Sequence, residues 1–324
     1  MHTLGSVITL TLSAIKSPHP WRSRLHLFWA LSRTPHAIID MAGPGAAALL
    51  CLGRFPSLWI TLIGLVTVFS GYTAVYAIND LVDYQPDRRK FRQGGYADDD
   101  DEAYLDGALV RHPLAKGAIR MREAVLWVAA WSALAILGAY WLNPVCLLIF
   151  LVGCGLEVVY CLLWRITPYR ALINGVVKTS GALAAVYAVN PTPSPLFLGI
   201  LFLWIFFWEI GGQNIPNDWI DMAMDRCYGA KTMPVRFGEG RARLLSITSL
   251  ILAFFLNMLV MLVSPLPFTA FHYLLALAAN FFLLLLPALK LYQVPHRDQA
   301  MGLFNKASYY PLAMLGVSLS AFMV

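Results

Sequence analysis

The sequence predicts an all-α integral membrane protein built as a bundle of about nine transmembrane helices. The first observation is composition, because 59% of the 324 residues are apolar and only 13% are charged. Mean hydropathy is accordingly high, at +0.63. The second observation is that apolar stretches long enough to cross a bilayer recur along most of the chain. A soluble chain of this length would form about two domains, but this composition argues against a soluble protein.

Nine apolar stretches are long enough to span, at residues 35–53, 57–80, 124–142, 144–164, 171–190, 195–215, 244–263, 267–289 and 302–323. Gly43, Pro44 and Gly45 interrupt the first stretch, and neighbouring helices can satisfy the backbone groups that such a break frees. Residues 1–30 are basic and aromatic, which is typical of a segment at the lipid headgroups. We therefore expect an interfacial segment, 1–30, followed by a single transmembrane domain, 31–324.

The positive residues predict the orientation and exclude one class of partner. Of the 24 lysines and arginines, 21 fall in segments that nine spans would place on the same side of the membrane as the N-terminus. The positive-inside rule assigns that side to the cytoplasm and the C-terminus to the outside. The net charge of +6 then reflects membrane orientation and not nucleic-acid binding. We expect a multi-pass protein of the inner cell membrane.

A polar motif closes the second apolar stretch. It runs from Asn79 to Asp87 and reads NDLVDYQPD. Asn79, Asp83 and Asp87 are spaced four residues apart, which places them on one face of a helix, with Asp80 beside them.

A second acidic motif closes the sixth apolar stretch. Asp218, Asp221 and Asp225 follow the spacing i, i+3, i+7, which is again one helix face. Both motifs lie on the predicted cytoplasmic side, and carboxylates that face one another repel unless a cation lies between them. Oxygen ligands without His or Cys favour a hard divalent ion, in particular Mg²⁺. The five cysteines show no metal-binding spacing.

The longest polar segment, 88–123, follows the first motif and is expected to be a cytoplasmic loop. It contains five consecutive acidic residues, Asp98 to Glu102, flanked by glycines. Such a run is typical of a solvated loop, so we assign no metal to it. The basic residues on either side, Arg88 to Arg92 and Arg111 to Arg122, are better placed to face a phosphate.

Together these motifs resemble the UbiA superfamily of intramembrane prenyltransferases. The shared pattern is Asn-Asp-x-x-Asp-x-x-x-Asp, then Asp-x-x-Asp-x-x-x-Asp, then the tail KTMPVRFG that begins at Lys231. Residues 111–117, RHPLAKG, are similar to the family's Arg-Pro-Leu-x-x-Gly segment with one residue inserted. The resemblance covers roughly residues 30–320.

The resemblance implies a central apolar cavity, capped on the cytoplasmic side, in which a prenyl group passes from a prenyl diphosphate to a small, aromatic acceptor such as a quinone precursor. It implies Mg²⁺ as the cofactor. By match to the family motifs, Asp83 and Asp87, with Asn79, bind one ion. Asp221 and Asp225, helped by Asp218, bind the other.

The resemblance also implies basic residues that hold the diphosphate. Lys231 is one, and either Arg92 or Arg111 is another, because the loop between them is longer than the family usually has. Lys116 and Asn214 are further substrate-binding candidates. Positive side chains and metal ions stabilise the negative charge of a departing diphosphate, and an apolar cavity keeps water from the allylic cation.

Tyr160 resembles the family tyrosine that faces the allylic cation. The basic residue that usually follows it four positions later is Trp164 here. Arg165 and Arg170 are the candidates that replace this base.

Ionisable residues inside spans are functional candidates or partners of one another. Those in this chain are Asp40, Glu157, Lys178, Glu209 and Lys306. Residues that could shape the acceptor pocket are Arg33, Asp40, Asn174, Lys178, Gln213 and Asn214. They leave an aromatic acid, a quinone precursor, a porphyrin-type ring and a sugar phosphate open as acceptors.

Two alternative functions remain. A terpene cyclase on the same scaffold would ionise a prenyl diphosphate without an acceptor. An acid-lined cation transporter would also place carboxylates in a helical bundle. The outer halves of spans two and six, 59–68 and 195–206, are almost wholly apolar, which argues against a polar path across the membrane.

Overall fold

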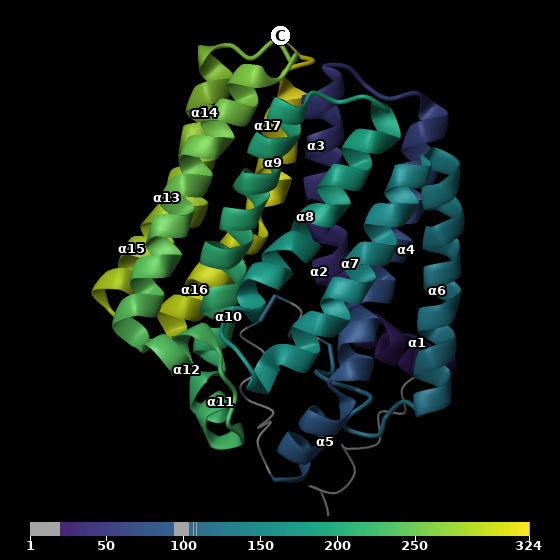
Figure 1. Ribbon diagram of the computed structural model, residues 1–324, viewed down its shortest axis with the longest axis vertical. Helices are drawn as coiled ribbons and strands as arrows, with labels where there is room; N and C mark the ends of the chain where they lie inside the picture. The colour runs from purple at the N-terminus through teal and green to yellow at the C-terminus, as the bar shows by residue number, and fades with distance from the viewer. Residues whose placement is uncertain (1–19, 94–103, 106, 108, 324) are drawn as a thin grey trace, which may run out of the picture.

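Long helices stand side by side along the long axis of the molecule, and shorter helices gather at one end (Figure 1). The computed structural model describes residues 20–93, 104–105, 107 and 109–323, and all regular structure within them is helical. Residues 1–19 and the acidic run 98–102 lie outside the described part.

The helices, in chain order, are α1 (Pro20–Leu31), α2 (Thr34–Asp40), α3 (Ala42–Leu52), α4 (Leu58–Val82), α5 (Tyr84–Arg92), α6 (Met121–Leu142), α7 (Pro144–Leu162), η2 (Leu163–Arg165), α8 (Arg170–Val189), α9 (Pro195–Trp208), η3 (Glu209–Asn214), α10 (Ile215–Ile220), α11 (Met222–Tyr228), α12 (Met233–Phe237), α13 (Glu239–Val263), α14 (Ala270–Asn280), η4 (Phe281–Leu285), α15 (Leu286–Gln293), α16 (Arg297–Ser308) and α17 (Tyr310–Ser320). Of these, η2 is a 3₁₀ turn, and η3 and η4 are π-helical segments within longer helices.

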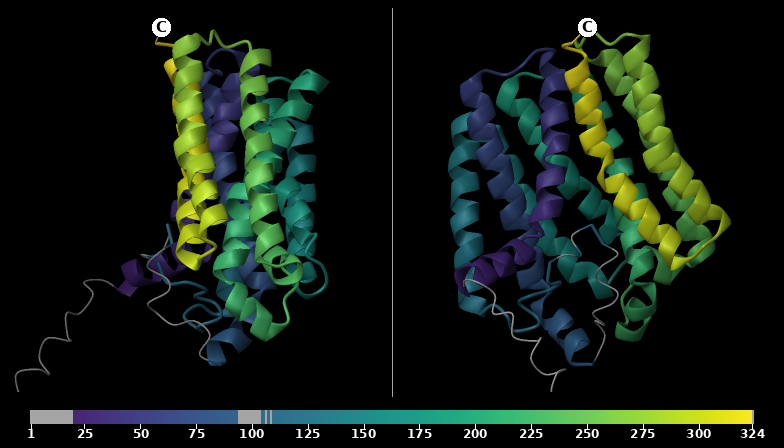
Figure 2. Two further views of the ribbon diagram at one scale, coloured as in Figure 1. Left: turned by 90° about the vertical axis from the view of Figure 1, so that its left-hand side faces the viewer. Right: turned by 180° about the vertical axis from the view of Figure 1, so that it is seen from behind.

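The predicted membrane bundle is confirmed. Eight helical segments of the described chain are long and apolar enough to cross a membrane, and they correspond to the first eight predicted stretches. The ninth stretch is divided between α16 and α17, which continue one another along the bundle (Figure 2). They meet at Tyr309, because Pro311 has no N–H to donate to residue 307.

The first span bends at a different place from the one expected. α2 and α3 meet at Met41, ahead of the Gly43-Pro44-Gly45 sequence, which is helical. Pro44 lies in the first turn of α3, where an N–H would have no helical partner. Its ring would clash with the carbonyl of residue 40 in a continuous helix, so the break precedes it.

Helix packing places the main core between α3, α8, α9, α13 and α17. Its fully buried side chains include Leu50, Leu201, Leu250, Tyr310 and Met314. A hydrogen-bonded chain crosses this core: Trp204 Nε1 donates to Tyr310 Oη at 3.1 Å, and Tyr310 Oη donates to Asn280 Oδ1 at 3.0 Å. Because lipid offers polar groups no partner, such bonds hold membrane helices to one another.

The two ends of the bundle differ. At the end where the C-terminus lies, the connections are short, at residues 53–57, 143, 190–194 and 264–269. At the opposite end α5, α11 and α12 lie below the long helices (Figure 1). We call this the motif end, because both acidic motifs lie there.

α1 lies across the motif end, beside α6, at a steep angle to the bundle (Figure 2). Phe28 of α1 stacks on Trp127 of α6, with ring centroids 4.9 Å apart. Arg24 Nη2 lies 2.5 Å from Glu123 Oε1. α1 is therefore attached to the start of the third span, whereas residues 1–19 of the predicted interfacial segment lie outside the described residues.

Candidate active site

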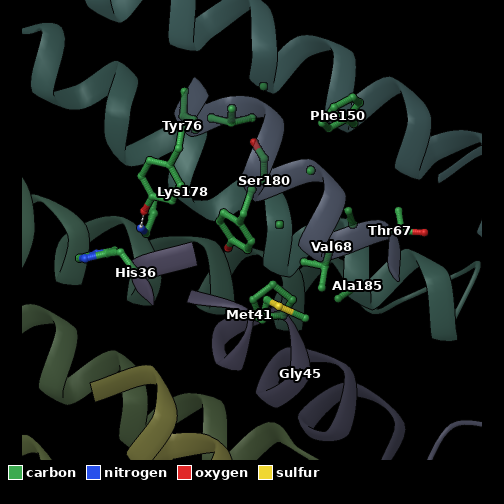
Figure 3. Close-up of a pocket in the computed structure, with 18 of the residues that line it drawn as sticks. His36, Met41, Gly45, Thr67, Val68, Tyr76, Phe150, Lys178, Ser180 and Ala185 are labelled. Atoms are coloured by element: carbon green, nitrogen blue, oxygen red, sulfur yellow. Dashed lines mark hydrogen bonds between the residues drawn. The ribbon is translucent and has the colours of Figure 1, made fainter. Parts of the chain in front are cut away.

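A cavity of about 600 Å³ lies inside the bundle. Its walls come from α2, α3, α4, α7, α8 and η3, with Leu315 and Leu319 of α17. In Figure 3, Val68, Phe150 and Ala185 form an apolar region, whereas Tyr76 and Lys178 point toward one another beside His36. Toward the motif end the lining becomes polar, with Asn79, Tyr160 and Asn214. The cavity therefore joins an apolar chamber to a polar mouth.

The first motif lies at a helix junction. α4 ends at Val82, Asp83 occupies the junction with φ −82° and ψ 2°, and α5 begins at Tyr84. The backbone bonds Asp83 N–H to Asn79 O and Asp87 N–H to Asp83 O, both 2.9 Å, continue the helical repeat through the junction. The expected stripe of Asn79, Asp83 and Asp87 therefore lies along two helices that share one repeat.

The second motif repeats this arrangement. Asp221 lies between α10 and α11 with φ −92° and ψ 4°, and Asp225 N–H donates to Asp221 O at 2.9 Å. The central aspartate of each motif thus occupies the sparsely populated bridge region between two helices, a conformation common in active sites. The sequence spacing gave no sign of these junctions.

Arg111 and His112 connect the two motifs. Arg111 Nη2 lies 3.2 Å from Asp221 Oδ2 of the second motif. His112 Nδ1 lies 3.3 Å from Asp80 Oδ1 and 3.1 Å from Asp87 Oδ2 of the first motif. His112 adopts φ +50°, in the left-handed region that costs a residue with a side chain about 1–2 kcal/mol. Backbone strain of this kind is found where the surroundings hold a functional residue in place.

Sequence reasoning missed His112. It is the residue inserted into the Arg-Pro-Leu-like segment, and that insertion was the signal available. Burial opposes its charged form, but Asp87 and Asp80 raise the pKa of His112 to about 9. His112 is therefore a cation at neutral pH. Asp80, which was expected to lie beside the stripe of Asn79, Asp83 and Asp87, contacts this cation.

The carboxylates of the two motifs fit a site for a hard cation. Burial and the negative charge of Asp87 raise the pKa of Asp83 to about 6. Burial, together with Asp218 and Asp221, raises the pKa of Asp225 to about 7. Both shifts mean that the clustered carboxylates resist ionisation, which a divalent ion between them would reverse.

The protein's own cations partly take the place of such an ion. Within the described residues no three His, Cys, Asp or Glu side chains form a preformed metal cluster. Asp218 Oδ1 instead accepts a hydrogen bond from Arg170 Nη2 at 2.8 Å, and Asp221 pairs with Arg111. All candidate ligands are carboxylate or amide oxygens, which is the set that Mg²⁺ takes.

Arg170 and Asn214 position Tyr160. The guanidinium of Arg170 lies over the Tyr160 ring, with Cζ 4.5 Å from the centroid. Asn214 Nδ2 donates to Tyr160 Oη at 3.3 Å. Of the two arginines considered as replacements for the missing base, Arg170 is buried against this ring, whereas Arg165 is exposed at 5.2 Å from the centroid of the Trp164 ring.

The π-helical segment η3 brings Asn214 to the cavity. Gly211 is pressed against α13, so that a Cβ there would lie 2.6 Å from Ser246 O, and Ser246 Oγ donates to Gly211 O at 2.6 Å. The wider π turn aims Glu209, Gln213 and Asn214 into the cavity lining. Such π segments recur at functional sites.

Lys90 belongs to the basic run 88–92 that was expected to face a phosphate, but its contact with Trp164 was not predicted. Its ammonium lies 4.3 Å from the centroid of the Trp164 ring and 3.7 Å from Asp87 Oδ1. A positive charge therefore reaches Trp164 from α5, in place of the base expected at position 164 itself. Lys231 binds the same residue through its backbone, with N–H donating to Trp164 O at 2.9 Å, and its side chain is exposed.

The structure separates Arg111 from Arg92, the other candidate for the diphosphate. Arg111 lines the cavity and stacks on Tyr104, with Cζ 4.5 Å from the ring centroid. Arg92 lies at the end of α5 and, like Lys116, lines a second pocket that shares no lining residue with the cavity.

Four of the five ionisable residues inside spans have polar side-chain partners, and Asp40 and Lys178 pair with each other. Lys178 Nζ lies 2.5 Å from Asp40 Oδ2 and donates to Tyr76 Oη at 3.2 Å. Glu209 accepts from Asn174 Nδ2 at 2.8 Å, and Glu157 accepts from Asn79 Nδ2 at 2.7 Å. Lys306 is exposed on α16. The Glu157 bond reaches the first motif and could not be read from the sequence.

Comparison with known proteins agrees with this geometry. The model of the UbiA prenyltransferase family matches residues 41–309. The chain belongs to this family. The resemblance drawn from the motifs is thereby confirmed.

Two curated UbiA relatives align over part of the chain. A digeranylgeranylglyceryl phosphate synthase of Thermococcus kodakarensis is 24% identical over 205 residues, which are 63% of this chain and 65% of that protein. A 4-hydroxybenzoate octaprenyltransferase of Aeromonas salmonicida is 24% identical over 201 residues, which are 62% of this chain and 63% of that protein. The chain therefore spans just under two thirds of the length of either relative.

Solved structures of UbiA homologs share the fold. The apo structure of a UbiA homolog from Aeropyrum pernix K1 has a TM-score of 0.67 and 21% identity, covering 89% of this chain and 98% of that one. A UbiA homolog from Archaeoglobus fulgidus bound to GPP and Mg²⁺ has a TM-score of 0.60 and 19% identity, covering 92% of this chain and all of that one.

Proposed function

We propose that this protein transfers a prenyl group from a prenyl diphosphate to a small, aromatic acceptor inside the membrane, with Mg²⁺ as cofactor. The observation that carries the proposal is the pair of acidic motifs joined by Arg111 and His112 at the mouth of an apolar cavity. The family match and the homolog bound to GPP and Mg²⁺ support it.

Two sets of oxygens would hold the ions. Asp83 and Asp87, with Asn79, would bind one Mg²⁺, and Asp221 and Asp225, helped by Asp218, the other. Bound Mg²⁺ would supply positive charge that stabilises the departing diphosphate.

Basic side chains would hold the diphosphate oxygens. Arg111 and Arg170 already pair with second-motif carboxylates, so each is held at the level where the phosphates would lie. Lys231 is exposed at the motif end and can approach from outside. Arg111 takes the arginine role in this proposal, because Arg92 lies outside the cavity.

Tyr160 would face the allylic carbon as the diphosphate leaves. Its ring lies in the cavity lining, and an electron-rich aromatic face stabilises a nearby cation. The prenyl tail would lie against apolar residues such as Val68 and Phe150, where water is excluded.

The acceptor would enter the polar region around Tyr76 and Lys178. Both line the cavity with Asn174 and Glu209, and together they offer hydrogen-bond donors and acceptors close to the mouth. One aligned relative is named for 4-hydroxybenzoate, and an aromatic acceptor of similar size is our proposal here. We further propose that the motif end faces the cytoplasm in the inner membrane, as the lysines and arginines predict.

The test is diphosphate release. Purified protein is incubated with Mg²⁺ and labelled prenyl diphosphates of several chain lengths, with and without candidate aromatic acceptors. Release that requires an acceptor supports the transferase, whereas release with a hydrocarbon or alcohol product would identify a terpene cyclase. Absence of release with every chain length would contradict both and return a cation transporter to consideration.

The matched variants are Asp83→Ala and Asp221→Ala. Each should remain folded and lose turnover, because each removes the central carboxylate of one motif. Full activity in either variant would show that the proposed metal ligands are wrong.

A further inference from the structure

A second pocket, of about 430 Å³, lies at the motif end between α5 and residues 114–121. Tyr84, Arg88 and Arg92 of α5 line one side, and Lys116, Arg120 and Met121 line the other. Arg88 and Arg92 are four residues apart, so they lie on one face of α5, next to the face that carries Asp83 and Asp87. α5 thus carries Asp87 on the side of the active site and a pair of arginines on the side of this pocket.

The pocket is strongly basic. Among the described residues, its lining includes four lysine or arginine residues and no aspartate or glutamate. Within the described part of the chain, Arg88, Arg92 and Arg120 form no ion pair. The nearby Glu123 pairs with Arg24 and accepts a hydrogen bond from the backbone N–H of Arg120 at 3.1 Å. The charges of Arg88, Arg92 and Arg120 gather around one hollow and repel one another, so an anion is the ligand that stabilises them.

The pocket is partly shaped before a ligand arrives. Arg88 donates a hydrogen bond to Tyr84 Oη and lies over the same ring. Residues 112–118 form a compact turn, in which Ala118 N–H donates to Pro113 O at 2.9 Å and Gly117 closes the turn with φ +77°. Leu114 and Ile119 in the pocket lining belong to an apolar cluster packed against α1 and α6.

The pocket lies beside the start of a candidate membrane span. Met121 is the first residue of the span Met121–Leu142, and Arg120 precedes it. Met121 and Phe91, both in the lining, are each 39% exposed. Basic side chains beside exposed apolar ones at the start of a span match a headgroup phosphate with its adjoining acyl chain.

We propose that this pocket binds a phosphate group presented at the membrane boundary, either the headgroup of an anionic lipid or a free diphosphate. The two sources share the chemistry that Arg88, Arg92, Lys116 and Arg120 recognise, because arginine binds phosphate oxygens through paired N–H donors. The pocket shares no lining residue with the cavity, so the site is separate from the proposed transferase centre and does not depend on that reaction.

The experiment is a lipid titration of the purified protein followed by native mass spectrometry. Dioleoylphosphatidylglycerol is compared with dioleoylphosphatidylcholine, for wild type and for Arg88→Gln/Arg120→Gln. The matched control is Arg236→Gln/Arg241→Gln, which removes the same charge from exposed arginines at the same end of the molecule. Single Arg120→Gln and a thermal melt of each protein separate loss of the site from loss of the fold.

We expect wild type and control to bind the first phosphatidylglycerol equally, and the Arg88/Arg120 variant to bind it about thirtyfold more weakly. That factor follows from roughly fivefold for each basic residue near a phosphate surface. Sodium diphosphate that displaces the lipid identifies free diphosphate as a ligand, and phosphatidylglycerol binding that resists diphosphate identifies the lipid. Equal binding of the two lipids, or equal loss in the control variant, would overturn the proposal.

Discussion

Arg111 and His112 are consecutive in the chain, yet their side chains contact different acidic motifs. Arg111 lies 3.2 Å from Asp221, and His112 lies 3.1 Å from Asp87. The left-handed backbone at His112 turns the two side chains apart. Arg111 and His112 thereby hold the two motifs together at the mouth of the cavity, although Asn79 and Asp218 are 139 residues apart in sequence.

Arg111→Gln should lower kcat/KM for diphosphate release by about 10²–10³-fold, because one preorganised donor to developing negative charge has that value in other enzymes. Arg92→Gln should have a smaller effect, since Arg92 does not line the cavity. Steady-state kinetics with one prenyl diphosphate measures both. Equal losses in the two variants would contradict the assignment of Arg111.

Asp225→Asn should stabilise the metal-free protein while removing activity. The folded-state pKa of Asp225 is raised from 3.8 to about 7, so its ionisation opposes folding. This cost is absent below about pH 3, where the group is protonated in both states, grows as the pH rises from 3.8 toward 7, and is complete above pH 7. In EDTA at pH 8 we expect a gain of about 2 kcal/mol, discounted for relaxation around the charge.

Thermal melts of wild type and Asp225→Asn between pH 4 and pH 8 measure this difference. The gain should shrink as the pH falls. Mg²⁺ should raise the melting temperature of wild type more than that of the variant, because the variant lacks one ligand. A variant that is less stable than wild type at pH 8 would show that Asp225 is not under repulsion.

Glu157→Ala should raise the Mg²⁺ concentration needed for half-maximal activity by about tenfold or more, as removal of a group that orients a metal ligand commonly does. Glu157 accepts from the amide of Asn79, which leaves the Asn79 carbonyl oxygen for the ion. Glu157→Gln keeps an acceptor oxygen and should change the Mg²⁺ requirement little. A Mg²⁺ titration that is the same for both variants would show that Glu157 acts only in packing.

Tyr160→Leu should reduce turnover about tenfold, because it removes the aromatic face on which Arg170 lies. Tyr160→Phe keeps that face and loses only the bond from Asn214 at 3.3 Å, so its loss should be smaller. Single-turnover rates separate the two effects. A larger loss of turnover in Tyr160→Phe than in Tyr160→Leu would show that the hydroxyl, and not the aromatic face, supports turnover.

Gly211→Ala should destabilise the protein by about 1–3 kcal/mol, as overpacking in a tight helix interface does. The new Cβ would lie 2.6 Å from Ser246 O, a backbone atom of α13 that cannot move alone. Gly199→Ala is the matched control, since nothing lies within 4 Å of a Cβ there. Thermal melts should show a loss for Gly211→Ala and none for Gly199→Ala.

Much of the bundle could be predicted because membrane spans are determined locally. A backbone in lipid must satisfy its own hydrogen bonds, so an apolar stretch of sufficient length becomes a helix whatever its neighbours are. The breaks were less predictable. Helices are divided at Met41 and Tyr309, each of which lies two or three residues before a proline. The break in the first span was expected at Gly43 to Gly45, but these glycines are helical.

The candidate site divides in the same way. The aspartates of both motifs follow from spacing along one helix face, which sequence records. The partners Arg111 to Asp221, Arg170 to Asp218 and Glu157 to Asn79 link residues between 48 and 110 positions apart, which no local pattern reports. Lys90 of α5 likewise places a positive charge against the ring of Trp164, the position at which a basic residue was expected.

The sequence by itself determined that the chain crosses the membrane as helices and that two acidic motifs close two of them, because hydropathy and helical periodicity are local properties. Only the tertiary structure decided that Arg111 faces the cavity while Arg92 faces a separate pocket. It also decided that His112 joins the first motif. These outcomes depend on how α4, α5 and the segment before α6 pack in space, and side-chain direction after a turn is determined by that packing.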